Sequence, residues 1–468
     1  MKKFGENVGA HKIMPRPMDQ ECFCTKGDGY LGAWHAQPPR LEYGYKYAGG
    51  LGVYCSSHLP MAIHAPEARK TFFCWGGMAR GESGRPRNWD FCTGQQLHMV
   101  SYYDHRTGLV PRPTILFDKY CADTHDNPVM SIDSDGHIWI FSPSHGEWTT
   151  PSFIHRSVEP YSIERFETVA EGLFAYPQPW WNRKHGFVFL HTRYQNGRML
   201  HLQVSPDGRQ WSEPRPLAGI QQGHYHVSAM HGDKIGMVFN FHPEIGGLDA
   251  RTNLYYMQSG DGGATWQSVE GENLALPLME VHNQALAHDY QKEKKLVYVM
   301  DFNYDADGNP VVLYILSASH IPGPDSGGRE WCVSRFESGR WRTSSVTVSD
   351  SNYDCGALLL GKNTWRIIGP SEPGPQPWTP GGEMARFVSH DRGENWTKEA
   401  VLTSQSGCNH TYARRVLNGH RDFAVLWADG DTWKFNQSFL YFCGLDSDQV
   451  YRLPPLMTED FAAPEELQ

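Results

Sequence analysis

The sequence predicts an all-β fold, a seven-bladed β-propeller of four-stranded antiparallel blades. Three observations support this prediction: a turn motif that occurs three times, short segments of alternating polarity between its copies, and the lack of any long segment with the roughly 3.6-residue period of an amphipathic helix. Aromatic residues make up 13% of the chain and charged residues 20%, a composition typical of a protein with a large buried core.

The turn motif presents Ser, Asp and Gly ahead of a Trp, in Ser205–Trp211, Ser259–Trp266 and Ser389–Trp396. The Asp can bond the backbone two residues on, the Gly adopts a positive φ, and the Trp folds back over the turn. Weaker copies occur at Ser131–Phe141 and Asp305–Pro310. The serines of the three copies are 54 and 130 residues apart, and the second spacing fits two units of about 65 residues. At that length, 468 residues correspond to about seven units.

Short runs of alternating apolar and polar residues lie between these turns, interrupted by Gly, Pro, Asn and Asp. Residues 187–194, 234–241 and 295–302 have the length and pattern of β-strands. The Pro- and Gly-rich residues 369–382 are better interpreted as a long loop than as a linker between domains. We therefore expect one propeller domain over residues 1–468, with a loose tail after about residue 456.

The composition argues against two classes of protein. Asp and Glu outnumber Lys and Arg by 52 to 42, whereas nucleic-acid binders carry a basic surface. No apolar run reaches the roughly 20 residues that cross a bilayer, so we expect no membrane span. Residues 1–17 lack the apolar stretch of a secretory signal, so we expect a cytoplasmic protein or one whose leader has been removed. The ten cysteines contain no C-x-x-C pair, and we expect buried thiols rather than disulfides or zinc ligands.

Four residues at strand ends are the candidates for catalysis. His125 precedes one predicted strand and His145 follows the next, so an out-and-back pair brings both to one end of a blade. Tyr176 and Arg193 occupy the corresponding positions around the next two strands. Loops at one end of successive blades converge on one funnel, so these side chains can form a site. Tyr194 competes with Tyr176 for the role of the phenol, because neighbouring strand residues face opposite ways.

Further polar residues are candidates for binding substrate: Tyr194, His224, Arg251, His410 and His58. Any one histidine in such a set is more often a structural residue bonded to a backbone carbonyl than a catalytic one. Exposed aromatic rings stack on sugars, and Trp34, Trp180 and Trp181 are candidates for that role.

His, Tyr and Arg without a convincing pair of carboxylates favour proton abstraction beside a carboxylate over glycoside hydrolysis, which uses two Asp or Glu. The Arg would neutralise the substrate carboxylate and acidify the adjacent C–H bond. An imidazole or a phenolate would take the proton, and a second His or the Tyr would protonate the leaving oxygen. This chemistry is β-elimination from a uronic acid, and the predicted partner is an acidic oligosaccharide or polysaccharide.

Several short strings together resemble the BNR-4 family of propellers, which contains seven-bladed ulvan lyases and rhamnosyl-glucuronate lyases. The strings are His125–Pro128, Ser144–Gly146, Tyr176–Pro179, Thr192–Tyr194, Gly223–Tyr225, Arg251–Tyr255, Asn409–Tyr412 and Tyr451–Pro454. The resemblance extends over nearly the whole chain, from about Gly49 to Pro454. In those lyases two histidines about twenty residues apart, a tyrosine and an arginine form the site. The resemblance therefore implies catalytic roles for His125, His145, Tyr176 and Arg193.

Two alternatives remain open from the sequence. A related branch resembles α-L-rhamnosidases that use a histidine on the opposite face of the propeller, and the matching segment Gly49–Pro60 makes His58 the candidate. The other alternative is a propeller that binds glycans without catalysis. The chemistry requires no cofactor. Members of the family can hold a metal near the propeller axis, so a structural divalent cation such as calcium is an expectation from the resemblance, without a ligand set in the sequence.

Overall fold

The computed structural model describes residues 22–33, 35–51, 57–79, 95–120, 123–145, 151–194, 197–433 and 437–467. Strands dominate the regular structure of these residues, and the remainder is three short 3₁₀ turns, η3 (Thr124–Asp126), η4 (Gly247–Ala250) and η5 (Pro324–Ser326). The all-β prediction is confirmed. No helix in the described ranges is long and apolar enough to cross a membrane.

Five sheets of the described chain contain four antiparallel strands each, and every strand pairs with the one that follows it in the sequence. The sheets are β10 (Val129–Ile132), β11 (Ile138–Ser142), β12 (Ser152–Ser157) and β13 (Phe166–Gly172); β14 (Ala175–Asn182), β15 (Gly186–Tyr194), β16 (Arg198–Ser205) and β17 (Arg215–Ala218); β18 (His226–His231), β19 (Lys234–Phe241), β20 (Thr252–Ser259) and β21 (Leu286–His288); β22 (Leu296–Tyr304), β23 (Pro310–Ser317), β24 (Arg329–Glu337) and β25 (Arg340–Ser349); and β26 (Ala357–Leu360), β27 (Trp365–Glu372), β28 (Glu383–Ser389) and β29 (Thr397–Val401).

An 11-stranded sheet joins the two ends of the chain. Its strands in order are β1 (Thr25–Lys26), β9 (Thr114–Asp118), β7 (Leu97–Asp104), β6 (Lys70–Gly77), β5 (Ala62–Ala65), β30 (Asn409–His420), β31 (Phe423–Gly430), β32 (Gln437–Cys443), β33 (Val450–Arg452) and β35 (Glu465–Glu466), with β2 (Leu31–Ala33) pairing to β32 and β6. Two small sheets pair β3 (His35–Leu41) with β4 (Gly44–Gly49) and β8 (Val110–Pro111) with β34 (Phe461–Ala462).

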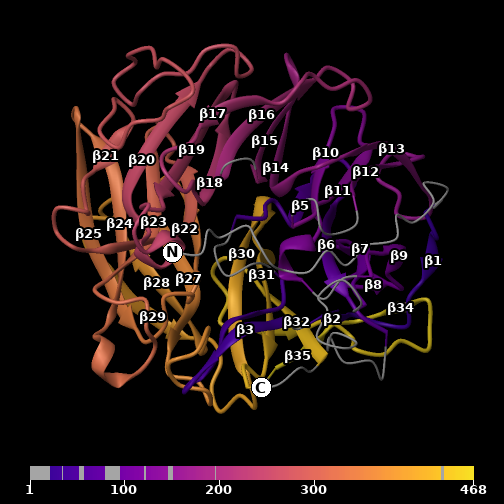
Figure 1. Cartoon of the computed structure of the whole chain (residues 1–468). Coiled ribbons are helices and arrows are strands. Elements are labelled where there is room, and N and C mark those ends of the chain that lie inside the picture. Colours follow the sequence, from indigo (N-terminus) through magenta and orange to yellow (C-terminus); the bar gives the residue numbers. More distant parts are fainter. Residues whose placement is uncertain are drawn as a thin grey trace, which may run out of the picture.

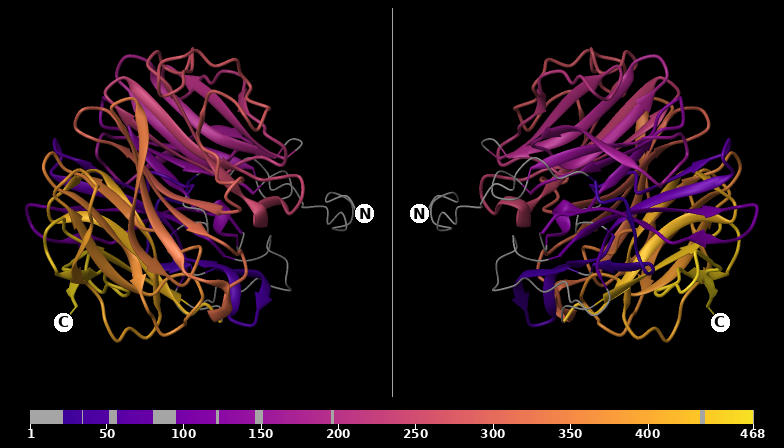
Figure 2. Two further views of the ribbon diagram at one scale, coloured as in Figure 1. Left: turned by 90° about the vertical axis from the view of Figure 1, so that its left-hand side faces the viewer. Right: turned by 90° about the vertical axis from the view of Figure 1, so that its right-hand side faces the viewer.

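The sheets follow one another around a centre in chain order (Figure 1). The first strand of each four-stranded sheet contacts the first strand of the next, from β10 through β14, β18 and β22 to β26, and β5 and β30 complete the series. Side views show strands running between the two faces of this ring (Figure 2). The arrangement is propeller-like, as the sequence predicts.

Both faces of each sheet are buried against neighbouring sheets. This burial explains why the sequence of β15 is almost continuously apolar. Phe187 and Phe189 pack with aromatic residues of the preceding sheet, whereas Val188 and Leu190 pack with residues of the following sheet. Successive strand residues point to opposite faces, so a run of apolar residues fills two interfaces at once. Each such side chain contributes on the order of 1.5–3 kcal/mol by leaving water.

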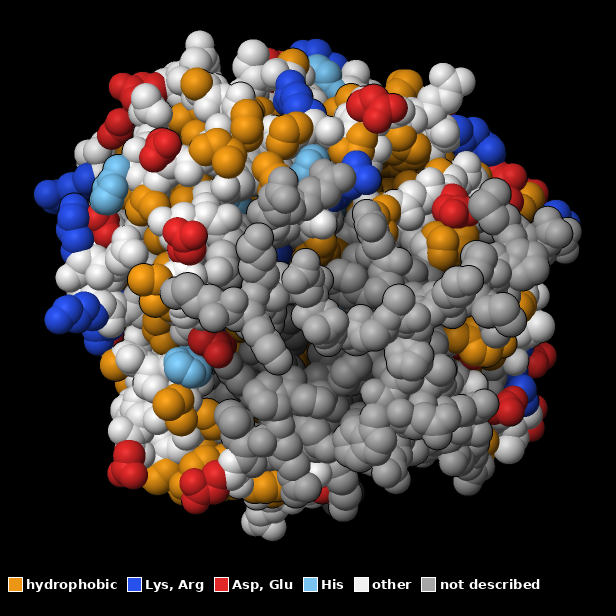
Figure 3. All heavy atoms as spheres, in the orientation of Figure 1, with side chains coloured by type: hydrophobic (Ala, Val, Ile, Leu, Met, Phe, Trp, Pro, Cys, Tyr) orange, Lys and Arg blue, Asp and Glu red, His pale blue; other side chains and the backbone are white. Residues whose placement is uncertain are grey.

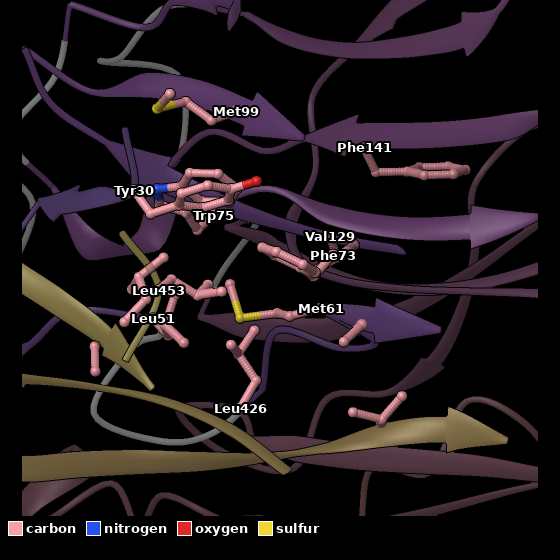
Figure 4. Close-up of a cluster of buried hydrophobic side chains, with 14 of the residues drawn as sticks. Tyr30, Leu51, Met61, Phe73, Trp75, Met99, Val129, Phe141, Leu426 and Leu453 are labelled. Carbon is pink, nitrogen blue, oxygen red and sulfur yellow. The ribbon is translucent and has the colours of Figure 1, made fainter. Parts of the chain in front are cut away.

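The ring closes where the two ends of the chain meet. Tyr30 stacks on Trp75 with ring centroids 5.4 Å apart, and Phe73 packs beside them. Leu426 and Leu453, from the C-terminal part of the chain, belong to the same buried cluster (Figure 4). Segments far apart in the sequence therefore share one core at this junction.

The three strong copies of the turn motif each connect the third strand of a sheet to the fourth. In the copy at Ser259, Oγ donates to Asp261 Oδ1 at 2.8 Å and accepts from the Gly263 amide at 2.9 Å. Gly263 has a φ of +85°, and a Cβ there would lie 2.6 Å from the Leu202 side chain, so glycine is required. Trp266 is 1% exposed and plugs the turn. The other two copies make the same Ser–Asp and Ser–Gly bonds.

The tail is not loose. After residue 456 the chain forms β34, which pairs with β8, and β35, which pairs with β33. Strand pairing of Phe461–Ala462 and Glu465–Glu466 holds the tail in place. The tail is short and polar, so its sequence gives no sign of these pairings.

The described cysteines are free thiols, and Cys74, Cys332, Cys355 and Cys443 among them are buried. Cys55, Cys92 and Cys121 lie outside the described residues. Acidic and basic side chains are mixed over the described part of the face in Figure 3, so the net charge of −10 does not gather there in one patch.

Candidate active site

Asp123 joins the two predicted catalytic histidines. Its Oδ2 accepts a hydrogen bond from His145 Nδ1 at 2.6 Å, and its Oδ1 accepts from His125 Nδ1 and, at 2.9 Å, from the His125 backbone amide. Asp123 immediately precedes η3 and His125 lies in it, just before β10, whereas His145 follows β11. Because β10 and β11 are an antiparallel pair, their flanking residues meet at one end of the sheet.

The two imidazole rings stack face to face, with centroids 3.4 Å apart and planes 9° from parallel. His125 is buried, whereas the His145 side chain is 19% exposed. Burial lowers the pKa of His125 to about 4, and the nearby carboxylate of Asp123 only partly opposes this. Burial opposes ionisation of Asp123 as well, but the two histidines and their hydrogen bonds hold its pKa well below the usual range. The carboxylate is therefore ionised at neutral pH, and it fixes protons on both Nδ1 atoms.

Two tyrosines of the next sheet contact this pair. Tyr176, at the start of β14, lies edge-on to His125 at 5.4 Å, and Tyr194, at the end of β15, lies edge-on to His145 at 5.3 Å. Tyr194 Oη donates to Tyr176 Oη at 3.1 Å. Tyr176 is fully buried with a φ of +51°, at a register shift of β14 against β15. Burial raises the pKa of Tyr194, although the charge of Arg198 opposes the shift, so its phenol keeps its proton at neutral pH.

Arg193 does not lie in the cluster. The arginine beside the tyrosines is Arg198, whereas the sequence analysis predicted Arg193. Arg193 pairs with Met199 across β15 and β16, and its charge acts on His191 and His201, so it faces away from Tyr194. Arg198 is the register partner of Tyr194 and lies over its ring at 5.5 Å. Side chains directly opposite each other in a strand pair share a face, and neighbours in one strand do not.

His58 lies directly behind the cluster rather than on the opposite face. Its Nε2 donates to the backbone carbonyl of His125 at 2.9 Å, and its ring lies 5.5 Å from that of Tyr176. Burial, reinforced by the charge of Arg414, lowers the pKa of His58 well below its usual value. The side chain is wholly buried, so in this conformation it supports Tyr176 and His125 and does not reach a substrate.

His224 and His410 were expected to bind substrate, and the structure gives both a structural role. His224 Nδ1 donates to the Asn240 carbonyl at 2.8 Å while Nε2 accepts from the Ile220 amide at 3.0 Å. His410 Nδ1 accepts from the indole of Trp427 at 3.0 Å, and Nε2 bonds Ser406 Oγ at the same distance. Both rings are buried, and both ring nitrogens already have partners. Burial keeps them neutral by lowering the pKa of each to about 4.

Arg251 lies at the border of the cluster. Its guanidinium sits over Tyr225 at 4.9 Å and over Tyr298 at 4.5 Å, and Nε donates to the Leu248 carbonyl at 2.6 Å. Tyr225 in turn lies edge-on to Tyr176 at 5.4 Å. Arg251 is 1% exposed, so it does not contact a substrate in this conformation. Its contribution to the site is a positive charge behind the Tyr225 ring.

Trp180 and Trp181 do not offer sugar-stacking surfaces beside the cluster. Trp180 is 2% exposed and its indole donates to Ser228 Oγ, while Trp181 donates to Ser134 Oγ. Both lie near the end of β14, away from Tyr176 at its start. Trp34 lies outside the described residues.

Asp123, His125 and His145 also have the composition of a metal site, because one ligand atom from each lies within 4.8 Å of the others. Two imidazoles and a carboxylate suit a transition metal, whereas calcium takes six to eight oxygen ligands. In the arrangement seen here the Nδ1 atoms donate to Asp123, so the carboxylate acts as an orienting acceptor.

Sequence reasoning missed Asp123 and Arg198. Asp123 stands two residues before His125, a spacing at which a carboxylate can bond both the ring and the backbone amide, and that spacing was the available signal. Arg198 could be found only from the pairing of β15 with β16, which depends on the number of residues between the two strands.

The comparisons with known proteins agree with this fold. The sequence profile of the BNR repeat-containing family matches residues 91–349. Similar solved structures include a PL25 ulvan lyase, at 17% sequence identity and a TM-score of 0.67, over 89% of this chain and 94% of that chain. The same values hold for a PL25 ulvan lyase bound to -[GlcA(1-4)Rha3S]-. The polysaccharide lyase Uly1 matches at 12% identity and a TM-score of 0.59, over 92% of this chain and 99% of that chain. Among curated proteins, no sequence matches this chain.

Proposed function

The chain belongs to the BNR repeat-containing family, and from the geometry of its site we propose that it is a polysaccharide lyase that cleaves a uronic-acid-containing glycan by β-elimination. The observation that carries the proposal is the Asp123 carboxylate, which fixes the proton of His145 on Nδ1 beside the Tyr194 phenol and the Arg198 guanidinium. A base of defined tautomer, a protonated phenol and a cation are the three groups that the reaction needs.

Each group has a distinct task. Arg198 pairs with the uronate carboxylate, which makes the neighbouring C5–H bond more acidic. His145 Nε2, which carries the lone pair because Nδ1–H points to Asp123, takes the C5 proton. The electron pair left on C5 forms the C4–C5 double bond as the C4–O bond breaks. Tyr194 donates its proton to the departing oxygen, and exchange with water then removes the proton from His145 and restores the one on Tyr194.

The electrostatics decide between the two assignments of acid and base. Burial raises the pKa of Tyr194, so a phenolate base would be costly to form, whereas a phenol donor is already in place. His125 is buried and neutral, stacked on His145, and it holds Asp123 and His145 in position rather than touching substrate. Tyr176 supports the Tyr194 hydroxyl in the same way.

The substrate in this proposal is a glycan with a rhamnose–glucuronate linkage. A PL25 ulvan lyase of similar fold is bound to -[GlcA(1-4)Rha3S]-, which supports a glycan of this kind as the substrate. We also propose that the molecule has seven blades. The 11-stranded sheet contains two antiparallel runs, β5–β6–β7–β9 and β30–β31–β32–β33, which with the five separate sheets would make seven.

The test is a lyase assay on rhamnose–glucuronate oligosaccharides, following the ultraviolet absorbance of the unsaturated uronate. We expect wild-type protein to produce the signal, and His145→Ala and Tyr194→Phe to lower kcat by about 10²–10⁴. Tyr255→Phe, a buried tyrosine whose hydroxyl donates to the Val281 carbonyl at 2.9 Å, is the control and should retain the rate. Sugar release without absorbance would indicate hydrolysis, and binding without turnover would indicate a glycan-binding propeller; either result would overturn the proposal.

A further inference from the structure

A second cluster of histidines lies at the junction between the two ends of the chain. His105, His420 and Asp422 each place a ligand atom within 4.8 Å of the others. The rings of His105 and His420 lie 3.9 Å apart, and His64 packs against both, at 5.0 and 5.1 Å. His420 Nδ1 lies 3.5 Å from Asp422 Oδ2.

His105 has one ring nitrogen that no neighbour satisfies. Thr71 Oγ1 bonds His105 Nε2 at 2.8 Å, which fixes the orientation of the ring. His105 Nδ1 is buried and makes no hydrogen bond within the described part of the chain. A buried ring nitrogen without a hydrogen-bond partner is unfavourable, so such a group marks a place for a water or a ligand.

The cluster is separate from the proposed active site. His125 and Tyr176 lie where the first strands β10 and β14 begin, whereas His64 and His420 lie toward the ends of the first strands β5 and β30. The two sites are therefore at opposite faces of the ring. None of the four side chains of this cluster has a task in the elimination reaction.

The four side chains also come from both sides of the junction. His64 lies on β5 and His105 follows β7, in the N-terminal run of the sheet, whereas His420 ends β30 and Asp422 lies in the turn before β31. The two runs are joined there by a single parallel register pair, Leu417 with Ile63. A ligand bound by residues from both runs would link the N-terminal and C-terminal runs where the ring closes.

We propose that His105, His420 and Asp422 bind a divalent transition metal of the zinc type, which holds together the N-terminal and C-terminal runs of the 11-stranded sheet. Two imidazoles and one carboxylate are ligands that Zn²⁺ prefers, and water would take the fourth position. Ligand atoms about 2.1 Å from a tetrahedral zinc lie about 3.4 Å from one another, and one ligand atom from each of the three residues already lies within 4.8 Å of the others. His64 packs behind the two rings and keeps them in place.

The experiment measures zinc binding and thermal unfolding on the full chain after treatment with a chelator. Titration calorimetry with ZnCl₂ should show a site in the wild type that is lost or weakened at least tenfold in His420→Gln and in Asp422→Asn. Zinc should raise Tm by a few degrees in the wild type and not in these variants. Asp422 is largely exposed, so Asp422→Asn should leave the fold unchanged. This variant therefore tests the site even where His420→Gln impairs folding.

Two further variants separate this site from other histidines. His145→Gln removes a ligand from the cluster of Asp123, His125 and His145. It should leave zinc binding at His105, His420 and Asp422, and the Tm shift, unchanged. His282→Gln, an exposed histidine that faces Asp289 at 3.1 Å in a different sheet region, is the matched control for surface histidine. Co²⁺ in place of zinc should give the visible absorption of a tetrahedral site in the wild type. The proposal is overturned where the wild type binds no zinc, or where His420→Gln and Asp422→Asn bind it with unchanged affinity and Tm shift.

Discussion

Replacing Asp123 by Asn tests the proposed site most directly, because this carboxylate accepts hydrogen bonds from both histidine rings. An asparagine has one carbonyl oxygen to accept such a bond, and its NH₂ group can only donate. In Asp123→Asn one of the two rings must therefore lose its bond or turn an Nδ1 lone pair toward the amide, which moves its proton to Nε2. If that ring is His145, the lone pair that acts as the base is gone.

The magnitude follows from the bonds that are lost. A hydrogen bond to a charged group contributes about 1.5–3 kcal/mol, so Asp123→Asn should lower the free energy of unfolding by about that amount. The effect on turnover should be larger, about 10²–10⁴ in kcat, which corresponds to about 3–5 kcal/mol of transition-state stabilisation. The change in kcat should exceed any change in KM, because Arg198, the group that we assign to the carboxylate of the substrate, is untouched.

The assay is the initial rate of unsaturated uronate formation, with the folded fraction measured by urea unfolding of the same preparation. Asp133→Asn is the matched control, because Asp133 accepts the indole N–H of Trp139 at 2.8 Å in the turn at the other end of β10 and β11. It should change kcat by less than about twofold. An Asp123→Asn protein that is folded and turns over at the wild-type rate would refute the reasoning, as would a loss of activity that only follows the loss of folded protein.

Three other predictions follow from the same contacts. Arg198→Ala should lower kcat/KM on uronate oligosaccharides at least about 10²-fold, whereas Arg193→Ala should change it less than about threefold; equal losses would contradict the assignment. Acid should destabilise the fold between pH 6.5 and about 4, because His125 has a pKa of about 4 when folded and an ordinary one when unfolded, so the unfolded chain binds the extra proton. The loss for this residue is about 3 kcal/mol, and urea unfolding of His125→Gln should show a flatter pH profile. Ser389→Ala removes the bonds to Asp391 and to the following glycine amide and should lower the free energy of unfolding by about 1–2 kcal/mol in urea; an unchanged midpoint would contradict this.

The fold could be predicted from the sequence because its signals are local. The Asp and Gly of each turn determine the turn by bonds within four or five residues, as in the bonds from Ser259 to Asp261 and Gly263. The candidate site could be predicted in part for a related reason. His125, His145, Tyr176 and Tyr194 lie at or just beyond the ends of paired strands, and antiparallel pairing brings the start of one strand next to the end of the other.

The remaining site residues depend on facts that a single sequence does not contain. Arg193 and Arg198 differ in which face of the sheet they occupy, and one residue more or less between β15 and β16 would exchange them. In the sequence, His224 looks as suitable for a site as His145. In the structure its two ring nitrogens make hydrogen bonds with the Ile220 amide and the Asn240 carbonyl. Which histidine bonds a backbone group and which bonds a carboxylate is decided by tertiary contacts.

The position of His58 bears on the choice between lyase and hydrolase. A hydrolase that used this histidine would need substrate to reach a ring that is wholly buried behind Tyr176. The Nε2 bond from His58 to the His125 carbonyl instead makes it part of the support for the Asp123 arrangement. The residue that favoured hydrolysis in the sequence and the residues that favoured elimination therefore belong to one cluster. Within that cluster, only the His145 imidazole and the Tyr194 phenol combine partial exposure with a group that can accept or donate a proton.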